Sequence, residues 1–228
     1  MVATRTTRVA EDYLTLIWKA CEWPDDGRHP TTSGLATALG VTPSTVSANL
    51  KRLAREGMIR YEPYGAIELT ADGERIARDV VRRHRILETF LVEHLDMAWD
   101  EIHDEADQLE HAASDRLIDR MDAILGRPAT DPHGDPIPRD GTNATVPAVV
   151  LASRAAGERV RIVRVSDTNP DILRFLSEHR IVLGTTMRVI TAMSPTGLMS
   201  ARRDNQPDGH PIELSDPIAS AIHVTVVA

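Results

Sequence analysis

This 228-residue sequence lacks the features of a secreted or membrane-spanning protein. Its one cysteine, Cys21, excludes an internal disulfide, which fits a reducing compartment. No apolar run approaches the ~18–20 residues that span a bilayer. Residues 1–14 contain no continuous apolar stretch or cleavage site of a secretory signal. We therefore predict a cytoplasmic protein with no membrane contact.

The common catalytic motifs are also missing. The sequence contains no HExxH, no glycine-rich phosphate loop and no G-x-S-x-G, which serve zinc hydrolysis, nucleotide binding and serine nucleophiles respectively. These absences argue against an enzyme. A metal-dependent hydrolase that uses the acidic cluster described below remains an alternative from a different class.

Negative charge is concentrated in the middle of the chain. Residues 1–85 hold 13 Lys/Arg against 11 Asp/Glu, residues 86–140 hold 4 against 15, and residues 141–228 hold 9 against 8. The net charge of −8 therefore does not exclude a nucleic-acid-binding module. The distribution allows a mildly basic module beside a carboxylate-rich one.

Two short helices with a tight turn between them are predicted near the N-terminus, after an amphipathic helix over residues 11–20. The first short helix, residues 33–39, follows threonine caps and ends at Gly40. The second opens at Thr42 or Pro43 and runs through Arg55. Helices joined in this way are typical of a helix-turn-helix.

A hairpin is predicted directly after the second helix. Two β-rich runs, residues 58–61 and 66–69, flank the turn-forming Pro63-Tyr64-Gly65. A hairpin in this position is the wing of a winged helix-turn-helix. Winged modules also serve as protein-interaction domains, so an interaction module without a metal is a further alternative.

The second helix carries small hydroxyls at its start and basic residues along it. The hydroxyls predicted to reach base edges and phosphates in the major groove are Thr42, Ser44, Thr45 and Ser47. The basic residues predicted to contact phosphate are Lys51, Arg52, Arg55 and Arg60. The alternative is that these hydroxyls only cap the helix and the basic side chains are solvated.

The rest of the chain changes from helical to β-rich at a linker. Asp72 is expected to cap a long helix to about Leu95, and residues 99–125 predict another amphipathic helix. Residues 126–147, rich in proline and glycine, predict a linker. A small β-barrel is expected from β-rich runs at residues 158–165, 186–192, 197–203 and 220–227, with a short helix over 171–178.

Carboxylates and imidazoles recur at one-turn spacing on the two long helices. Asp107, Glu110 and His111 stand at i, i+3 and i+4, hence on one helix face, and His103 lies one turn earlier. The preceding helix carries a further i, i+4 pair, His84 and Glu88. Such a set can supply half an octahedral shell to a hard or borderline divalent ion. Spacing alone does not separate a metal site from a solvated acidic face.

Several motifs, in order, resemble one family of regulators. They are DYLTLIW, GVTPSTVSANLKRLAREGMI, RRHRILETFL, HDEADQLEHAASD and DPHGDPIP. Together they look like the diphtheria-toxin-repressor family of metal-dependent transcriptional regulators, and most like its manganese-transport-regulator branch. The resemblance is close over residues ~8–140 and loose over residues ~145–228, which are similar to an SH3-like FeoA domain.

The resemblance implies an α+β protein in three parts that acts as a homodimer on a palindromic operator in double-stranded DNA. We expect a winged helix-turn-helix DNA-binding domain in residues 1–73 and an all-α metal-binding and dimerisation domain in residues 74–126. After the linker over residues 127–147, residues 148–228 are expected to form the small SH3-like β-barrel. The implied function is metal-activated repression of metal-uptake genes.

The resemblance also implies metal ligands by position. The activating site takes Asp12, Asp107, Glu110 and His111, and the other site takes His84, Glu88 and His103. Asp167 is the best candidate for a ligand from the FeoA domain, whereas the barrel histidines His179, His210 and His223 fit surface or structural roles better. Thr15 departs from short manganese regulators that have glutamate there, so their paired-metal site cannot be carried over whole.

The identity of two ligands points to manganese. The iron-sensing branch has methionine where Asp12 stands and cysteine where Asp107 stands. Hard carboxylate oxygen suits Mn²⁺, whereas soft sulfur favours later transition metals. We predict Mn²⁺ as the activator, with Fe²⁺ or Co²⁺ as substitutes. The same fold sensing ferrous iron is the nearest alternative.

Overall fold

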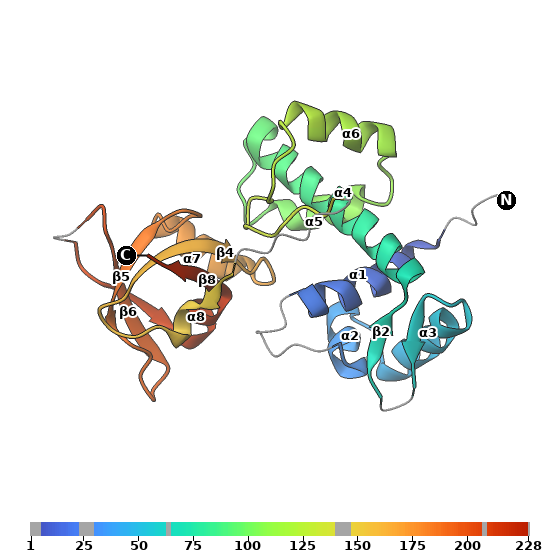
Figure 1. The fold of residues 1–228 in the computed structure, drawn as a ribbon, viewed down its shortest axis with the longest axis horizontal. Helices are drawn as coiled ribbons and strands as arrows, with labels where there is room; N and C mark the ends of the chain where they lie inside the picture. Colours follow the sequence, from blue (N-terminus) through green and yellow to red (C-terminus); the bar gives the residue numbers. More distant parts are fainter. Residues whose placement is uncertain (1–5, 23–29, 63–64, 140–146, 207–208, 228) are drawn as a thin grey trace. The chain divides into compact units, whose positions relative to one another are not determined.

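The computed structural model describes residues 6–22, 30–62, 65–139, 147–206 and 209–227, and the chain divides into two compact units. Unit 1 comprises residues 1–84 and unit 2 comprises residues 85–228 (Figure 1). Each unit is described by itself. Among the described residues, no helix is both long and apolar enough to cross a membrane.

Unit 1 contains the predicted helix-turn-helix. Its elements are α1 (Arg8–Glu22), α2 (Thr32–Leu39), α3 (Pro43–Arg55), β1 (Ile59–Tyr61), β2 (Ile67–Leu69) and the start of α4 (Ala71–Leu95). Gly40 ends α2 with a left-handed φ of 63°, which glycine adopts at little cost. The Thr42 side chain accepts from the backbone N–H of Thr45 at the start of α3. The expected bounds of the second short helix are confirmed, and the first begins at Thr32, one residue earlier than expected.

One apolar cluster holds unit 1 together. Val46, Leu50 and Leu53 of α3 are fully buried against residues of the other helices and the hairpin. These three residues recur at i, i+4 and i+7, so they form the inward face of α3. The opposite face of the helix, which carries the hydroxyl and basic residues, is left toward solvent.

The wing is a two-stranded antiparallel hairpin. Ile59 pairs with Leu69 and Tyr61 with Ile67, as the β-rich runs predict, while Pro63 and Tyr64 of the expected turn lie outside the described residues. The expected helix cap at Asp72 is wrong, because the hydroxyl of Thr70 accepts from the backbone N–H of Gly73. Asp72 instead lies within the first turn of α4.

The helical part of unit 2 is more divided than the sequence pattern predicts. The single helix expected over residues 99–125 is two helices, α5 (Ile102–Leu109) and α6 (Asp115–Ile124). The side chain of Ser114 accepts from the backbone N–H of Leu117 and so begins a new helix. Apolar periodicity continues through the break because both helices pack on the same core, which includes Ile118.

Residues 127–139 pack into unit 2 even though their composition predicts a linker. Asp131, His133, Asp135 and Ile137 in this stretch are buried. The backbone of Asp131 and Asp135 closes a tight turn through an N–H to carbonyl bond of 2.9 Å. The remainder of the expected linker, residues 140–146, lies outside the described residues.

The C-terminal part of unit 2 is a six-stranded sheet in the order β3-β8-β4-β5-β6-β7. The strands are β3 (Val149–Val150), β4 (Arg159–Val165), β5 (Thr186–Thr191), β6 (Leu198–Arg203), β7 (Ile212–Ser215) and β8 (Ile222–Val226). Two helices, α7 (Pro170–Glu178) and α8 (Asp216–Ala221), and a short 3-10 turn (Leu151–Ser153) accompany it. The α+β class is confirmed.

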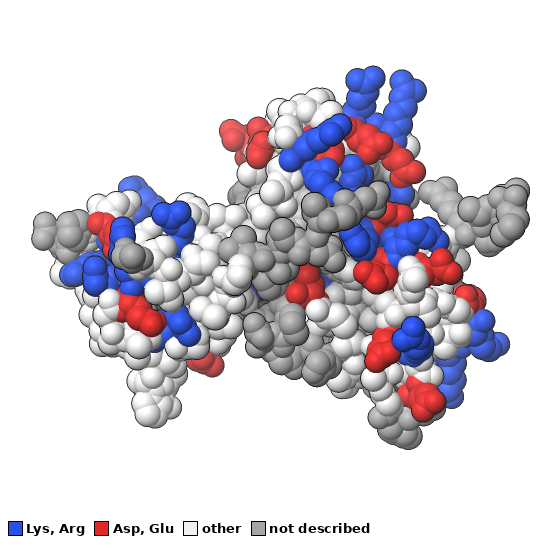
Figure 2. Space-filling view, viewed as in Figure 1, with Lys and Arg blue, Asp and Glu red and all other residues white. Residues whose placement is uncertain are grey.

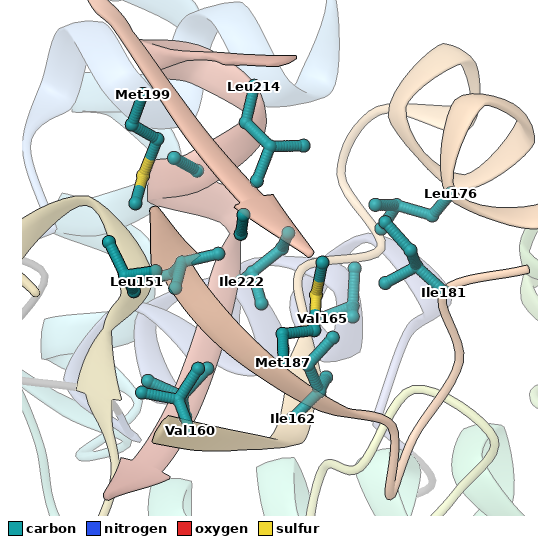
Figure 3. Close-up of a cluster of buried hydrophobic side chains, with 14 of the residues drawn as sticks. Leu151, Val160, Ile162, Val165, Leu176, Ile181, Met187, Met199, Leu214 and Ile222 are labelled. Carbon is teal, nitrogen blue, oxygen red and sulfur yellow. The ribbon is translucent and has the colours of Figure 1, made fainter. Parts of the chain in front are cut away.

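The sheet curls around an apolar core without closing. Ile162, Met187 and Ile222 lie among the side chains that fill it (Figure 3). No pairing joins the end strands β3 and β7 within the part of the chain that the structure describes. The sequence pattern did not predict β3, β7 or α8, which are short elements.

Candidate metal centre

Surface charge does not by itself mark a functional site. On the face shown in Figure 2, the coloured Lys/Arg and Asp/Glu side chains are intermingled rather than separated into large fields of one sign. The site must therefore be built from individual side chains and their contacts. Two groups of potential metal ligands lie in unit 2, and the candidate DNA-reading residues lie in unit 1.

The hydroxyls at the start of α3 are exposed and bonded to one another. Thr42 Oγ1 lies 2.8 Å from Ser44 Oγ and 2.9 Å from Thr45 Oγ1, and Ser47 is half-buried. Each hydroxyl can exchange its partner for a base edge or a phosphate without leaving a buried polar atom unsatisfied. This end of α3 is therefore open to a ligand.

The basic residues differ in how freely they can reach a ligand. Arg52 pairs with Glu56 at 3.5 Å and Arg60 with Glu68 at 3.4 Å. Lys51 is exposed and has no ion-pair partner among the described residues. Exposed pairs of this kind are weak, so they do not prevent a switch to phosphate.

The first group of potential ligands lies at the end of α5, and we name Asp107, Glu110 and His111 the helix group. Glu110 is the C-cap of α5 and keeps helical dihedral angles. Glu110 Oε1 lies 3.2 Å from His111 Nε2, and both side chains are nearly buried, whereas that of Asp107 is 52% exposed. Asp12, half-buried on α1, belongs to unit 1.

A second group assembles residues from distant parts of unit 2. His103 Nδ1 lies 3.4 Å from Glu88 Oε1 and 3.4 Å from Asp167 Oδ2. Glu88 comes from α4, His103 from α5, and Asp167 from the segment after β4. His84 precedes Glu88 by one turn on the continuous helix α4. Asp167, the candidate from the FeoA-like part, therefore lies beside two ligands expected from the helices.

Two buried residues join this group that sequence reasoning did not single out. Ligand atoms of Glu88, Asp131 and His133 lie within 4.8 Å of one another, and all three residues are buried. His133 Nδ1 is 3.9 Å from Glu88 Oε2. We name Glu88, His103, Asp131, His133 and Asp167 the tertiary group. The motif DPHGDPIP contained the signal, but its prolines and glycine indicated only a linker.

The orientation of His133 favours a metal over a proton-sharing contact. His133 Nε2 lies 2.9 Å from the carbonyl oxygen of Trp99, which can only accept, so Nε2 carries the hydrogen. In the neutral imidazole, which is the form that binds a metal, His133 Nδ1 then presents a lone pair toward Glu88, and this buried atom has no hydrogen-bond partner among the described residues. Fixing one imidazole nitrogen on a backbone carbonyl is a common arrangement for a metal-ligating histidine.

The electrostatics of the tertiary group also fit a cation. Burial, with the negative charges of Asp135 and Glu88, raises the pKa of Asp131 to about 8. Burial lowers the pKa of His133, but Glu88, Asp131 and Asp167 outweigh it and the pKa is raised. The surroundings of Asp131 and His133 therefore favour their protonated forms, and a divalent ion would displace those protons. The residues of this group offer carboxylate oxygen and imidazole nitrogen, and the exposed Cys21 belongs to no potential metal group among the described residues.

The three barrel histidines have other surroundings. His223 is buried and lies 3.2 Å from Arg164 NH1, while His179 Nδ1 bonds the carbonyl oxygen of Phe175. His210 is exposed. None of them belongs to a potential metal group among the described residues.

Family models match successive parts of the chain. The iron dependent repressor N-terminal DNA binding domain matches residues 5–67, and the iron dependent repressor metal binding and dimerisation domain matches residues 70–139. The FeoA domain matches residues 149–226.

Full-length relatives agree with these matches. The iron-dependent repressor IdeR of Mycobacterium leprae is 31% identical over 195 residues, which are 85% of this chain and 81% of that protein. The diphtheria toxin repressor of Corynebacterium efficiens is 28% identical over 95% of each chain.

Solved structures are similar over nearly the whole chain. A manganese-dependent transcriptional repressor in complex with manganese is 43% identical, with a TM-score of 0.88, and the match covers 96% of this chain and 100% of that one. The manganese regulator SloR is 28% identical with a TM-score of 0.78, over 96% and 98% of the two chains.

Proposed function

The chain belongs to the diphtheria-toxin-repressor family of metal-dependent transcriptional repressors, and we propose that Mn²⁺ is the metal that activates it. Members of this family are DNA-binding repressors and not enzymes, which removes the hydrolase alternative. The observation that carries the proposal is the sulfur-free donor set. Every residue of the helix group and the tertiary group offers a carboxylate oxygen or an imidazole nitrogen.

The activating site joins Asp12 of unit 1 to the helix group of unit 2. Carry-over by position supports this set, and so does the chemistry of Glu110 and His111, whose ligand atoms lie 3.2 Å apart on nearly buried side chains. Without a metal, bringing the carboxylates of Asp12, Asp107 and Glu110 together is unfavourable because like charges repel. These residues would hold Mn²⁺, whose positive charge would offset the repulsion and so would link α1, with its helix-turn-helix, to α5.

This arrangement makes metal binding a switch of conformational population. A ligand shifts an equilibrium only by its differential affinity for the two states. Moving from 1:99 to 99:1 requires about 5.5 kcal/mol. Four ligands that meet in only one of the two states can supply that difference, and the two recognition helices of a homodimer are then held at the spacing of a palindromic operator.

The tertiary group, with His84, forms a second metal centre. Glu88 faces His103 with one carboxylate oxygen and His133 with the other. It therefore lies at the middle of the set. Because this centre contains Asp167, it connects the helical part to the FeoA domain, for which we propose an SH3-like barrel. The domain bounds proposed from sequence are 1–73, 74–126 and 148–228. Of the stretch predicted as a linker, 127–147, residues 127–139 instead pack into unit 2 and supply Asp131 and His133.

Manganese is favoured over ferrous iron by ligand hardness. Mn²⁺ lies at the weak end of the divalent affinity series, so its sensors depend on geometry and hard oxygen ligands. Asp12 and Asp107 provide such oxygens. Iron remains the second candidate because relatives at 31% identity are named iron-dependent, whereas the solved structure at 43% identity is named manganese-dependent.

We place the protein in the cytoplasm, on operators of metal-uptake genes, with Thr42, Ser44, Thr45 and Ser47 reading bases. Thr45→Ala is expected to reduce discrimination between operator variants by ~1–3 kcal/mol. Lys51→Ala should weaken binding to all sequences equally and lower the salt slope by about one. Fluorescence anisotropy with matched operator variants checks both, and unchanged discrimination in Thr45→Ala would contradict the docking of α3.

The direct test of metal activation is DNA binding with and without Mn²⁺. Chelator should abolish binding to an operator fragment and Mn²⁺ should restore it. Asp107→Asn should lose the response, whereas Asp104→Asn, an exposed aspartate on the same helix, should keep it. Equal binding in chelator and in Mn²⁺ would show a winged-helix protein without a metal switch.

A further inference from the structure

Two buried arginines donate hydrogen bonds to the segment that carries Asp131 and His133. Arg85 of α4 donates from NH1 to the carbonyl oxygen of Pro136 at 2.6 Å. Arg164 of β4 donates from Nε to Asp135 Oδ1 at 2.6 Å. The side chains of Arg85 and Arg164 are 3% and 8% exposed. Residues 131–136 are thus held from the helical part and from the FeoA part at once.

Hydrogen bonds connect Arg164 to the ligand Asp131 through Asp135. The carboxylate of Asp135 accepts from Arg164, and the backbone N–H of Asp135 donates to Asp131 Oδ1 at 2.9 Å. The backbone N–H of His133 donates to the same oxygen at 2.8 Å. Arg85 Nε lies 3.5 Å from the other oxygen, Asp131 Oδ2. The direction of the Asp131 carboxylate is therefore fixed on both sides.

The same segment lies directly on β4. The backbone N–H of Val165 donates to the carbonyl oxygen of His133 at 2.8 Å. Gly134 has a left-handed φ of 92°, and a Cβ there would lie 2.2 Å from the carbonyl oxygen of Val163. No residue with a side chain fits this approach. The position of His133 therefore depends on its docking to the FeoA domain.

We propose that Arg164 is a positioning residue for the second metal centre. Through its bond to Asp135 it holds residues 131–136 so that Asp131 and His133 face Glu88. Burying two arginines and two aspartates is a poor way to gain stability, because desolvation offsets the attraction. Charged hydrogen bonds do fix direction and register, which metal ligands require. This inference rests on the proposed metal function.

The test is calorimetric titration of Mn²⁺ into the full-length protein. His133→Gln identifies the binding event that belongs to the tertiary group. Arg164→Gln is expected to weaken that event about 10-fold or more and to leave the event of the helix group unchanged. Arg161→Gln, which alters an exposed arginine on the same strand, is the matched control and should bind as the wild type does.

Two further variants separate positioning from a general loss of structure. Arg164→Lys keeps the charge and one donor, so it should recover part of the lost affinity. Gly134→Ala keeps every charge but cannot dock on β4, so it should weaken the same event. Urea unfolding without metal reports whether each variant is folded. If Arg164→Gln is not folded, the Mn²⁺ affinity of Gly134→Ala tests the proposal instead.

The outcomes distinguish this inference from the function on which it rests. If the wild type binds Mn²⁺ in both events and folded Arg164→Gln or Gly134→Ala binds identically, Arg164 does not position the centre. If the wild type itself binds no Mn²⁺, the proposed function is wrong, and the inference about Arg164 is wrong with it.

Discussion

The two ligand groups of unit 2 are built in opposite ways. The helix group comes from one turn at the end of α5, and its Asp107 is largely exposed. The tertiary group comes from α4, α5, the 131–136 segment and the end of β4, and its Glu88 and His133 are fully enclosed. An exposed, incomplete group of ligands suits a switch that is completed when metal binds. An enclosed group of ligands suits a metal centre that holds two parts of the fold together.

The largest effect is expected from the helix group. Glu110→Gln should lower operator affinity in Mn²⁺ by about 100-fold if the DNA-competent state is ~1% populated without metal. Glu105→Gln, an exposed residue on the same helix, should bind as the wild type does. Fluorescence anisotropy measures both. An affinity loss below threefold in Glu110→Gln would mean that this group is not the switch.

Removing the FeoA part should separate the two groups. A chain ending at Pro147 lacks Asp167, Arg164 and the β4 backbone that holds His133. It should remain a dimer with metal-dependent DNA binding weakened about 10-fold or less, while the Mn²⁺-binding event of the tertiary group is lost. Analytical ultracentrifugation and calorimetry check this, and a monomeric truncated chain would show that the FeoA part belongs to the dimer.

The smallest effect on DNA binding is expected from the tertiary group. His133→Gln should change operator affinity only a few-fold. It should, however, reduce the amount by which Mn²⁺ raises the free energy of unfolding. An ion that binds only the folded state contributes about 2.7 kcal/mol at a hundred times its Kd. Urea unfolding with and without Mn²⁺ measures the difference. A loss of operator affinity as large as that of Glu110→Gln would make the two groups equivalent.

The same contrast explains what could be predicted from sequence. The helix-turn-helix was predictable because its signals are local: Gly40 ends one helix, Thr42 caps the next, and Val46, Leu50 and Leu53 repeat at helical spacing. The helix group was predictable for the same reason. Periodicity failed where α5 and α6 share one core, because the break at Ser114 leaves the apolar pattern intact.

The tertiary group was only partly predictable. Resemblance indicated His84, Glu88, His103 and Asp167, but Asp131 and His133 lie in a stretch whose prolines and glycine predict a linker. Their burial depends on partners far along the chain, such as the Trp99 carbonyl and the Val165 N–H. No local pattern encodes such contacts, so a three-dimensional structure was needed to find them.

The claim that Mn²⁺ is the activator is tested most directly by operator affinity across buffered free Mn²⁺ and, under anaerobic conditions, free Fe²⁺. The wild type should reach half-activation at a much lower free Mn²⁺ concentration than the double variant Asp12→Met with Asp107→Cys. The double variant should respond better to Fe²⁺ than to Mn²⁺. Single substitutions need not be additive, since neighbours in one metal shell are coupled. If the wild type responds to Fe²⁺ at lower free concentration than to Mn²⁺, and the double variant keeps that order, ligand hardness does not select the metal.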